Sequence, residues 1–352
     1  MECVGELHGR ECFGCFTLRI RAMSAPNPFS CIQELSAGYF ASRCLHVAAE
    51  LGVADALGDE AMRIEPLAAK TGSNPDALSR ILRLLETQGV FTIEDGVVSQ
   101  TPASSLLRSD HPTSMRDFSR MFGLTLNWRS AELLADTVRT GEAAAPRAFE
   151  GGFWGRLERN PEEARVFDAA MTAKAMGQIG AILTSYDFGA FNHIVDVGGG
   201  QGHLIRAILR SHPSITGTLF DLPHVIEAAQ KGGDEGGRLR FQSGDFFKDE
   251  LPAADGYVLM EVIHDWADAE ATQIISAVRK SAALDAKLLL IETEVPETHE
   301  PDWSKTLDIV MLTLFAARQR TATEYKTLLS NSNFDLRERT DTQAGITVFE
   351  AV

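Results

Sequence analysis

The feature that most constrains the fold is a series of short apolar segments that alternate with helical patterns from His193 onward. The strand-like segments are Ile194-Val195, Thr218–Asp221, Leu239–Phe241, Gly256–Met260 and Leu288–Glu292. Helical segments separate most of them, and this alternation predicts a mostly parallel α/β sheet that is covered by helices. Residues 334–340 and 345–351 are expected to form closing strands, which brings the predicted sheet to seven strands.

The first of these strands runs into a glycine-rich turn, Asp196-Val-Gly-Gly-Gly-Gln-Gly202. Open parallel sheets bind ligands at the carboxyl ends of their strands, and glycines let the backbone approach a ligand closely. A dinucleotide-binding turn needs the pattern Gly-x-Gly-x-x-Gly, but His203 stands where the third glycine would be if Gly198 is the first. The spacing therefore disfavours a nicotinamide dehydrogenase.

Acidic residues follow the next two strands. Asp221 ends the second strand, where a carboxylate can accept hydrogen bonds from a ribose diol, although a helix cap before Pro223 is an alternative role. Asp245 and Phe246 follow the third strand, where a carboxylate beside an aromatic ring can bind and stack an adenine. Together with the glycine turn, these residues predict a nucleoside-binding edge.

Four motifs occur in order along this half of the chain: Asp196–Gly202, Phe220-Asp-Leu-Pro223, Gly244-Asp-Phe-Phe247 and His264-Asp-Trp266. In this order they resemble the S-adenosylmethionine-dependent O-methyltransferases of the plant caffeate and flavonoid type, which include bacterial polyketide and antibiotic enzymes. The resemblance covers nearly the whole chain from about residue 30. It implies a Rossmann-like catalytic domain, an N-terminal dimerisation domain, and methyl transfer to a phenolic hydroxyl of a small aromatic or polyketide-like metabolite.

The resemblance also implies which residues bind S-adenosylmethionine. They are Gly198, Gly200, Asp221, Leu222, Asp245, Phe246, Met260, Phe167 and Met171. Phe167 and Met171 fall where the family places apolar contacts around the methionine end of the cofactor, although their spacing also suits ordinary helix packing. Many relatives have lysine where this chain has Met260, so one side-chain contact to the cofactor is expected to be missing.

Two residues at the ends of the fourth and fifth strands are candidates for the chemistry. His264 directly follows the fourth strand and Glu292 ends the fifth, so both side chains are expected at the same edge of a parallel sheet. A phenol with a pKa of about 10 is mostly protonated at neutral pH, and histidine is a suitable base. We expect His264 to act as the general base, with Glu292 holding the proton of its other ring nitrogen.

One departure from the family concerns this base. Relatives commonly have a Gly-Gly-x-Glu-Arg-Thr segment, whose Glu lies beside the catalytic histidine, whereas this chain has Ala316-Ala-Arg-Gln-Arg-Thr321. Gln319 can still orient the imidazole, but it does not stabilise imidazolium by charge. We therefore expect His264 to be less basic than in relatives, or the acceptor to need less help. Some family members instead catalyse hydroxylation or decarboxylation; Gln319 leaves this alternative open, while His264 and Glu292 argue against it.

The acceptor pocket is expected between the sheet edge and the helical region. Its candidate lining residues are Asn127, Trp128, Trp154, Asp265, Met311 and Phe315. An apolar and aromatic lining suits a flat hydrophobic phenol. His264, Asp265 and Asp268 have the side chains of a metal site, but the two aspartates suit capping of the next helix better, so no metal is expected.

Residues 31–110 have the order helix, helix, hairpin that is typical of a winged helix. Asn74-Pro-Asp76 opens the second helix, and Glu94-Asp-Gly96 is a tight hairpin turn. A DNA-binding regulator is the weaker alternative, because this helix has only Arg80 and Arg83 as cations and the chain carries a net charge of −16. We expect no nucleic-acid partner, and packing of this module against a second copy in a homodimer.

The remaining expectations concern the rest of the chain. Residues 111–186 are predicted to form a helical linker that lines the acceptor pocket, residues 187–352 the methyltransferase domain, and residues 1–30 an extension with Met23 as an alternative start. No apolar run approaches the roughly 18 residues that span a membrane. The five cysteines all lie within residues 3–44 and are not spread through the fold, which favours a reducing cytoplasm over a disulfide framework. Cys12-x-x-Cys15 lacks a second pair at zinc spacing, which disfavours a metal or redox role for it.

Overall fold

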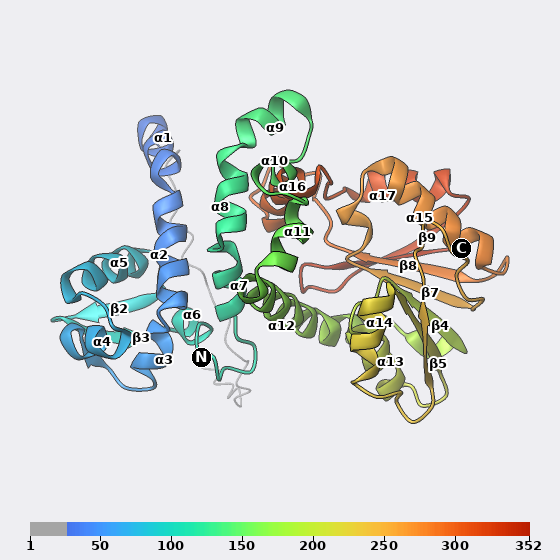
Figure 1. The fold of residues 1–352 in the computed structure, drawn as a ribbon, viewed down its shortest axis with the longest axis horizontal. Coiled ribbons are helices and arrows are strands. Elements are labelled where there is room, and N and C mark those ends of the chain that lie inside the picture. Colours follow the sequence, from blue (N-terminus) through green and yellow to red (C-terminus); the bar gives the residue numbers. More distant parts are fainter. Residues whose placement is uncertain (1–26) are drawn as a thin grey trace, which may run out of the picture.

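The computed structural model describes residues 27–352. Predictions for Cys3, Cys12, Cys15 and Met23 lie outside the described residues. Along the long axis of the molecule, Figure 1 shows an N-terminal module of helices and a small sheet, then a group of helices, then a large sheet near the C-terminus. Within the described residues, no helix is long and apolar enough to cross a membrane.

The N-terminal module has the predicted winged-helix order. Asn74 caps the second predicted helix as expected, since its Oδ1 accepts a hydrogen bond of 3.0 Å from the N–H of Ala77. The first helix begins at Pro28, so residues 28–30 belong to the folded module and not to the expected extension. The elements are α1 (Pro28–Ala37), α2 (Tyr39–Glu50), α3 (Val53–Leu57), α4 (Ile64–Thr71) and α5 (Pro75–Thr87), with β1 (Met62–Arg63), β2 (Phe91–Glu94) and β3 (Val97–Gln100) in one antiparallel sheet.

Helices fill the region between this module and the large sheet. The longest is α12 (Pro161–Ser185), which has 25 residues and runs toward the large sheet (Figure 1). Its first half packs on α7, and its second half packs on the sheet domain. The other helices here are α6 (Pro102–Ser105), α7 (Arg116–Phe122), α8 (Thr125–Glu132), α9 (Leu134–Thr140), α10 (Ala145–Ala148) and α11 (Gly152–Arg159).

The large sheet confirms the predicted α/β architecture. It has seven strands in the order β6-β5-β4-β7-β8-β10-β9, and β10 is antiparallel to both of its neighbours. Because β4 lies between β5 and β7, the connections reverse direction there, which is where open sheets of this type form a ligand crevice. The strands are β4 (His193–Val197), β5 (Thr216–Asp221), β6 (Leu239–Ser243), β7 (Gly256–Met260), β8 (Lys287–Glu292), β9 (Leu336–Asp341) and β10 (Thr347–Ala351).

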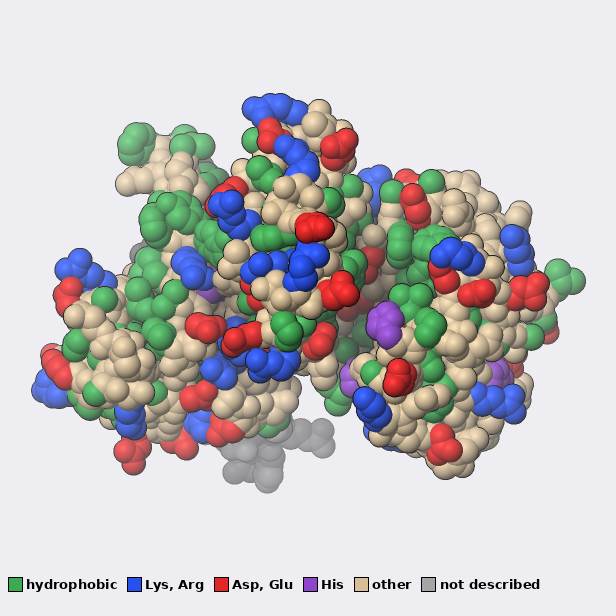
Figure 2. Space-filling model, viewed as in Figure 1, with side chains coloured by type: hydrophobic (Ala, Val, Ile, Leu, Met, Phe, Trp, Pro, Cys, Tyr) green, Lys and Arg blue, Asp and Glu red, His purple; other side chains and the backbone are tan. Residues whose placement is uncertain are grey.

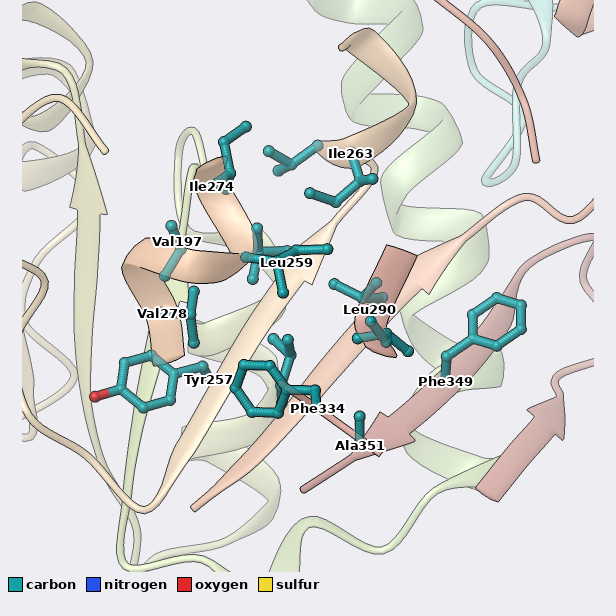
Figure 3. Packing of buried hydrophobic residues seen from close by; sticks show 14 of the residues in the cluster. Val197, Tyr257, Leu259, Ile263, Ile274, Val278, Leu290, Phe334, Phe349 and Ala351 are labelled. Atoms are coloured by element: carbon teal, nitrogen blue, oxygen red, sulfur yellow. The ribbon is translucent and has the colours of Figure 1, made fainter. Parts of the chain in front are cut away.

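Helices cover both faces of this sheet, which explains why its central strands are almost wholly apolar. On one face, Tyr257, Leu259 and Leu290 pack against α15 and α17, and Figure 3 shows these side chains beside Ile274 and Val278 of α15. On the other face, the alternate residues pack against α12, α13 and α14. The helices of this domain are α13 (His203–Ser211), α14 (Pro223–Gln230), α15 (Asp268–Ser281), α16 (Trp303–Phe315) and α17 (Ala322–Asn331).

Candidate active site

The glycine turn after β4 has the tight geometry that its sequence predicted. Gly198 and Gly200 have positive φ angles of 69° and 59°, and a Cβ at Gly199 would lie 2.4 Å from Cγ of Asp196. A side chain at Gly199 would therefore collide with the Asp196 carboxylate. The turn brings backbone close to the carboxyl ends of β4 and β7 and borders a cleft.

Two of the predicted nucleoside-binding residues, Asp221 and Phe246, lie beside the glycine turn. Asp221 Oδ2 accepts a 2.8 Å hydrogen bond from the N–H of Gly200, and its Oδ1 accepts one of 2.7 Å from the N–H of Leu222. The ring of Phe246 lies near Gly198, with Cε1 3.7 Å from where a Cβ of Gly198 would be. Asp245 follows β6 and pairs with Lys248 at 2.6 Å, and this pairing lowers the pKa of its carboxyl.

His264 and Glu292 meet as predicted. His264 lies in a short 3₁₀ turn after β7, and its Nδ1 is 2.7 Å from Oε2 of Glu292 at the end of β8. Glu292 is fully buried, and its Oε1 accepts hydrogen bonds from the N–H groups of Val262 and Ile263 at 3.1 and 2.7 Å. A carboxylate only accepts, so the neutral imidazole carries its proton on Nδ1 and leaves Nε2 free. The pair therefore has the geometry of a base and the group that orients it.

Negative charge surrounds this imidazole. Burial of His264 opposes protonation, but the charges of Glu292, Asp265 and Glu261 together outweigh burial and raise its pKa to about 9. Asp265 Oδ1 is 3.4 Å from His264 Nε2. The pKa of His264 is therefore above its ordinary value; the expectation that it is lower than in relatives stays a prediction.

Gln319 is buried close to the turn that carries His264. Its neighbour Arg320 donates hydrogen bonds to the carbonyls of Ile263 and Trp266 at 3.0 and 2.8 Å. The Gln319 side chain is 2 % exposed, and neither its Nε2 nor its Oε1 has a hydrogen-bond partner in the described chain. The contacts of His264 run to Glu292 and Asp265, so no hydrogen bond from Gln319 orients the imidazole here.

A cleft of about 640 Å³ opens between the glycine turn, His264 and the helical region. Aromatic and apolar side chains of α7, α11, α12 and α16 line one part of it, and the glycine turn and the turn that carries His264 line another part. Predicted site residues that line it are Gly198, Gly200, Met260, His264, Phe167, Met171, Asn127, Trp154, Asp265, Met311 and Phe315. Asp221, Leu222, Asp245 and Phe246 lie outside this lining.

Two predictions about individual residues are wrong. Trp128 does not line the cleft: its ring lies 6.2 Å from His46 and 6.4 Å from Tyr39, both in α2, because α8 turns this side chain toward the N-terminal module. The aspartates after His264 do not cap α15, whose N-cap is Ala267. Asp268 instead binds the buried guanidinium of Arg320 at 2.8 Å, and Asp265 borders the cleft.

The residues of the cleft that the sequence analysis missed as site residues include Asp196, Lys174 and Glu261. Asp196 is 1 % exposed, and burial raises its pKa to about 7. Lys174 of α12 forms an ion pair with Glu261, which directly follows β7, and both line the cleft. The position of Asp196 two residues before the first glycine, at the end of a strand, was a usable signal, whereas the Lys174–Glu261 pair joins distant segments and has no local signal.

The residues around the glycine turn fit an adenosyl cofactor that carries an amino acid. The two carboxylate oxygens of Asp196 are buried without a hydrogen-bond partner among residues 27–352, and the side chain borders the cleft. An unsatisfied carboxylate there suits the ammonium group of a methionine chain. Asp221 and Phe246 follow neighbouring strands, where they suit a ribose and an adenine. Within residues 27–352, no group of three His, Cys, Asp or Glu residues is placed to hold a metal ion.

Comparison with known proteins identifies the family. Residues 131–335 match the O-methyltransferase domain family, and residues 33–110 match the O-methyltransferase dimerisation domain. Phenazine O-methyltransferase PhzM of Lysobacter antibioticus is 40% identical over 327 residues, which cover 92% of this chain and 95% of that protein. The chain therefore belongs to the O-methyltransferase family, and it is an S-adenosylmethionine-dependent methyltransferase of the Rossmann-like class.

Solved structures agree with this assignment. The structure of CalO1, a methyltransferase in calicheamicin biosynthesis in its SAH-bound form, has a TM-score of 0.85 and 29% identity and covers 92% of this chain and 97% of CalO1. Human N-acetylserotonin methyltransferase in complex with SAM has a TM-score of 0.83 and 27% identity and covers 93% of this chain and 98% of that protein. The cofactor of this chain is S-adenosylmethionine.

Proposed function

We propose that the enzyme methylates a phenolic hydroxyl of a small planar aromatic metabolite. The observation that carries this proposal is the His264–Glu292 pair, whose histidine lines a cleft that is also lined by aromatic side chains. Phe153, Trp154 and Phe315 lie on one side of the cleft, with ring centroids 4.8 to 6.1 Å apart. Such a lining suits a flat ring. The phenazine in the name of the Lysobacter relative is also a planar ring system.

The cofactor supplies an electrophilic methyl group when it is bound, so the protein must bind and deprotonate the acceptor. We assign Gly198, Gly200, Asp196, Asp221, Leu222, Asp245, Phe246, Met260, Phe167 and Met171 to cofactor binding. Glu292 retains the proton on His264 Nδ1, and His264 Nε2 receives the proton of the acceptor hydroxyl. The raised pKa keeps the imidazole protonated in the empty cleft at neutral pH. A cationic ligand beside His264 favours release of that proton, which makes the base available when the cofactor is present.

The charge of the cleft favours an acceptor without a carboxylate. Its acidic lining residues are Asp168, Asp196, Glu261 and Asp265, and Lys174, the one Lys or Arg in the described lining, is already paired with Glu261. An anionic acceptor would enter a cleft in which carboxylates outnumber basic side chains and the one Lys or Arg side chain of the described lining is already paired. We therefore propose that the acceptor is neutral or positively charged.

The test is mass spectrometry of matched acceptor pairs incubated with S-adenosylmethionine. Each pair has the same phenolic ring, once with a carboxylic acid and once with its methyl ester. The wild type is expected to add one methyl group to the ester and far less to the acid, and His264→Ala is expected to add none. Equal reaction of acid and ester would contradict the charge argument. Methylation by His264→Ala at the wild-type rate would contradict the role of the base, and methylation only at an amine nitrogen would contradict the phenol.

We also propose that the enzyme is a homodimer formed through the N-terminal module. Phe29, Ile32 and Leu35 of α1 are 75%, 66% and 75% exposed. Figure 2 shows hydrophobic side chains gathered over this projecting helix. The match to the dimerisation domain supports a second copy as the partner that covers them. Light scattering is expected to give twice the mass of one chain for the wild type and a lower mass for Ile32→Asp/Leu35→Asp.

For the place of action we propose the cytoplasm. The proposal is supported by Cys31 and Cys44, the two cysteines in the described residues, which are both free thiols. Fractionation of the native source is the test, and recovery of the activity outside the cytoplasmic fraction would contradict it.

A further inference from the structure

The turn that carries His264 begins at an unusual backbone position. The N–H of Glu261 bonds the carbonyl of Ile291 at 2.9 Å and so extends the pairing of β7 with β8. Glu261 itself has a φ of 53°, in the left-handed region that non-glycine residues rarely adopt. This conformation turns the chain so that Val262 and Ile263 donate to Glu292 and His264 reaches the same carboxylate. The geometry of the base therefore depends on the conformation of Glu261.

A residue of α12, which lies outside the sheet, holds the side chain of Glu261. The Glu261 carboxylate forms an ion pair with Lys174 of α12. Burial alone would raise the pKa of Glu261, but the charges of Lys174 and His264 outweigh burial and lower it, so the carboxylate stays ionised. The side chains of Lys174 and Glu261 are only 20% and 16% exposed, at the wall of the cleft.

We propose that Lys174 and Glu261 are positioning residues for the methyl transfer: their ion pair holds the turn that carries His264 and sets the charge around its imidazole. This inference rests on the proposed role of His264 as the base. The two residues act through His264, so neither needs to contact the acceptor. α12 also contributes Phe167 and Met171 to the cleft, so one helix both lines the cleft and holds the turn that carries His264.

The charged and titratable groups around His264 come from β8, its own turn, α12, the segment with Arg320, and α17. Glu292 comes from β8, Asp265 from the same turn, and Glu261 with its partner Lys174 from the turn and α12. Behind the turn lie Arg320, which donates to the carbonyl of Ile263, and Tyr325 of α17. Among these groups, the Lys174–Glu261 pair can be changed without removing a hydrogen bond of His264 or Glu292. Loss of the Glu261 charge makes imidazolium less stable, whereas loss of the Lys174 charge leaves Glu261 unneutralised and makes imidazolium more stable.

The test is the pH dependence of kcat/KM at saturating cofactor for Glu261→Gln and Lys174→Met. The midpoint of the rising limb, where His264 loses its proton, is expected to move down by about one pH unit in Glu261→Gln and up by a similar amount in Lys174→Met. Lys174→Arg keeps the charge and is expected to keep the wild-type midpoint. A merely structural pair would lower activity in both variants without moving the midpoint in opposite directions.

A matched control is available elsewhere in the chain. Glu235 also has a left-handed φ, of 51°, and pairs with Arg210 at 2.7 Å outside the lining of the cleft. Glu235→Gln and Arg210→Met make the same charge changes and are expected to leave the midpoint unchanged. Thermal unfolding of every variant shows whether it is folded, and a variant that is not folded is replaced by Glu261→Ala or Lys174→Gln, which remove the same charges.

The outcomes separate this inference from the proposed function. If the wild type shows a midpoint that disappears in His264→Ala, but both pair variants keep it, the positioning role is overturned while the base stands. Shifts in the same direction overturn the positioning role as well. If His264→Ala retains the wild-type rate and profile, the proposed function fails first.

Discussion

Replacement of Glu292 by glutamine gives the sharpest test of the catalytic pair. In the wild type, Glu292 Oε2 accepts from His264 Nδ1 at 2.7 Å, while Oε1 accepts from Val262 and Ile263. In Glu292→Gln, the amide oxygen satisfies the two backbone N–H groups, so the NH₂ group faces Nδ1. The imidazole must then accept at Nδ1 and carry its proton on Nε2. The nitrogen that faces the acceptor therefore no longer removes a proton.

The expected loss of activity equals the contribution that a general base makes to the rate. Positioned general bases contribute about a hundred- to ten-thousand-fold, or about 3 to 5 kcal/mol of the activation free energy, and that whole contribution is lost. The fold is expected to lose less, because two hydrogen bonds to a charged acceptor become two to a neutral one, which lowers the free energy of unfolding by about 2 kcal/mol. We therefore expect Glu292→Gln to lose most of its activity while it stays folded.

Initial rates of S-adenosylhomocysteine formation, with phenols of decreasing pKa, measure the effect. A nitrophenol that is already ionised at neutral pH needs no base, so its rate in Glu292→Gln is expected to approach that of the wild type. Glu294→Gln is the matched control, since Glu294 lies just beyond β8 and pairs with Arg339 at 2.7 Å. A loss below tenfold with a phenol of ordinary pKa, or an equal loss for all phenols, would refute the tautomer argument.

Four further outcomes are expected. Gln319→Glu places a carboxylate near the His264 turn and is expected to move the pH–rate midpoint upward; an unchanged profile, with His264→Ala inactive, would contradict this placement. Phe246→Ala is expected to weaken cofactor binding about tenfold in calorimetry, because stacking of a base on an aromatic ring is worth about 1 to 3 kcal/mol; equal affinity would exclude stacking. Asn74→Ala removes the cap of α5 and is expected to lower the free energy of unfolding by about 1 kcal/mol without changing the chemistry, as denaturant titration and kcat would show. The pKa of His264 is raised from 6.5 to about 9, so its stabilising contribution is full below the lower value and is lost as pH rises through the upper one. The difference in unfolding free energy between the wild type and His264→Gln should fall across that window, and a rise would contradict the pKa shift.

The sheet and the contact between His264 and Glu292 could be predicted because both follow from local patterns and one geometric rule. Strands buried on both faces are continuous apolar runs, and the carboxyl ends of parallel neighbours meet at one edge. That rule alone placed His264 beside Glu292 and brought Asp221 close to Gly200. The cap at Asn74 was readable for the same reason, since a capping bond spans only three residues.

The parts that escaped prediction depend on how helices pack across long sequence separations. Trp128 suits a pocket by composition, but the orientation of α8 directs it to α2. Lys174 and Glu261 are 87 residues apart, and no spacing rule joins them. The place of Gln319 was inferred from a family motif, and the lack of hydrogen-bond partners for its amide could be seen only in three dimensions.

The cleft is built by two kinds of element, and this division bears on how the enzyme can be redesigned. The glycine turn, His264 and Glu292 lie at the ends of β4, β7 and β8, where the packed sheet supports them. Another part of the lining comes from α7, α11 and α16, whose aromatic side chains pack on one another outside the sheet core. Exchange of these helical segments between relatives should therefore transfer acceptor preference while the recipient retains its own reaction chemistry. Libraries aimed at new acceptors belong in the helices, where substitutions leave the sheet intact.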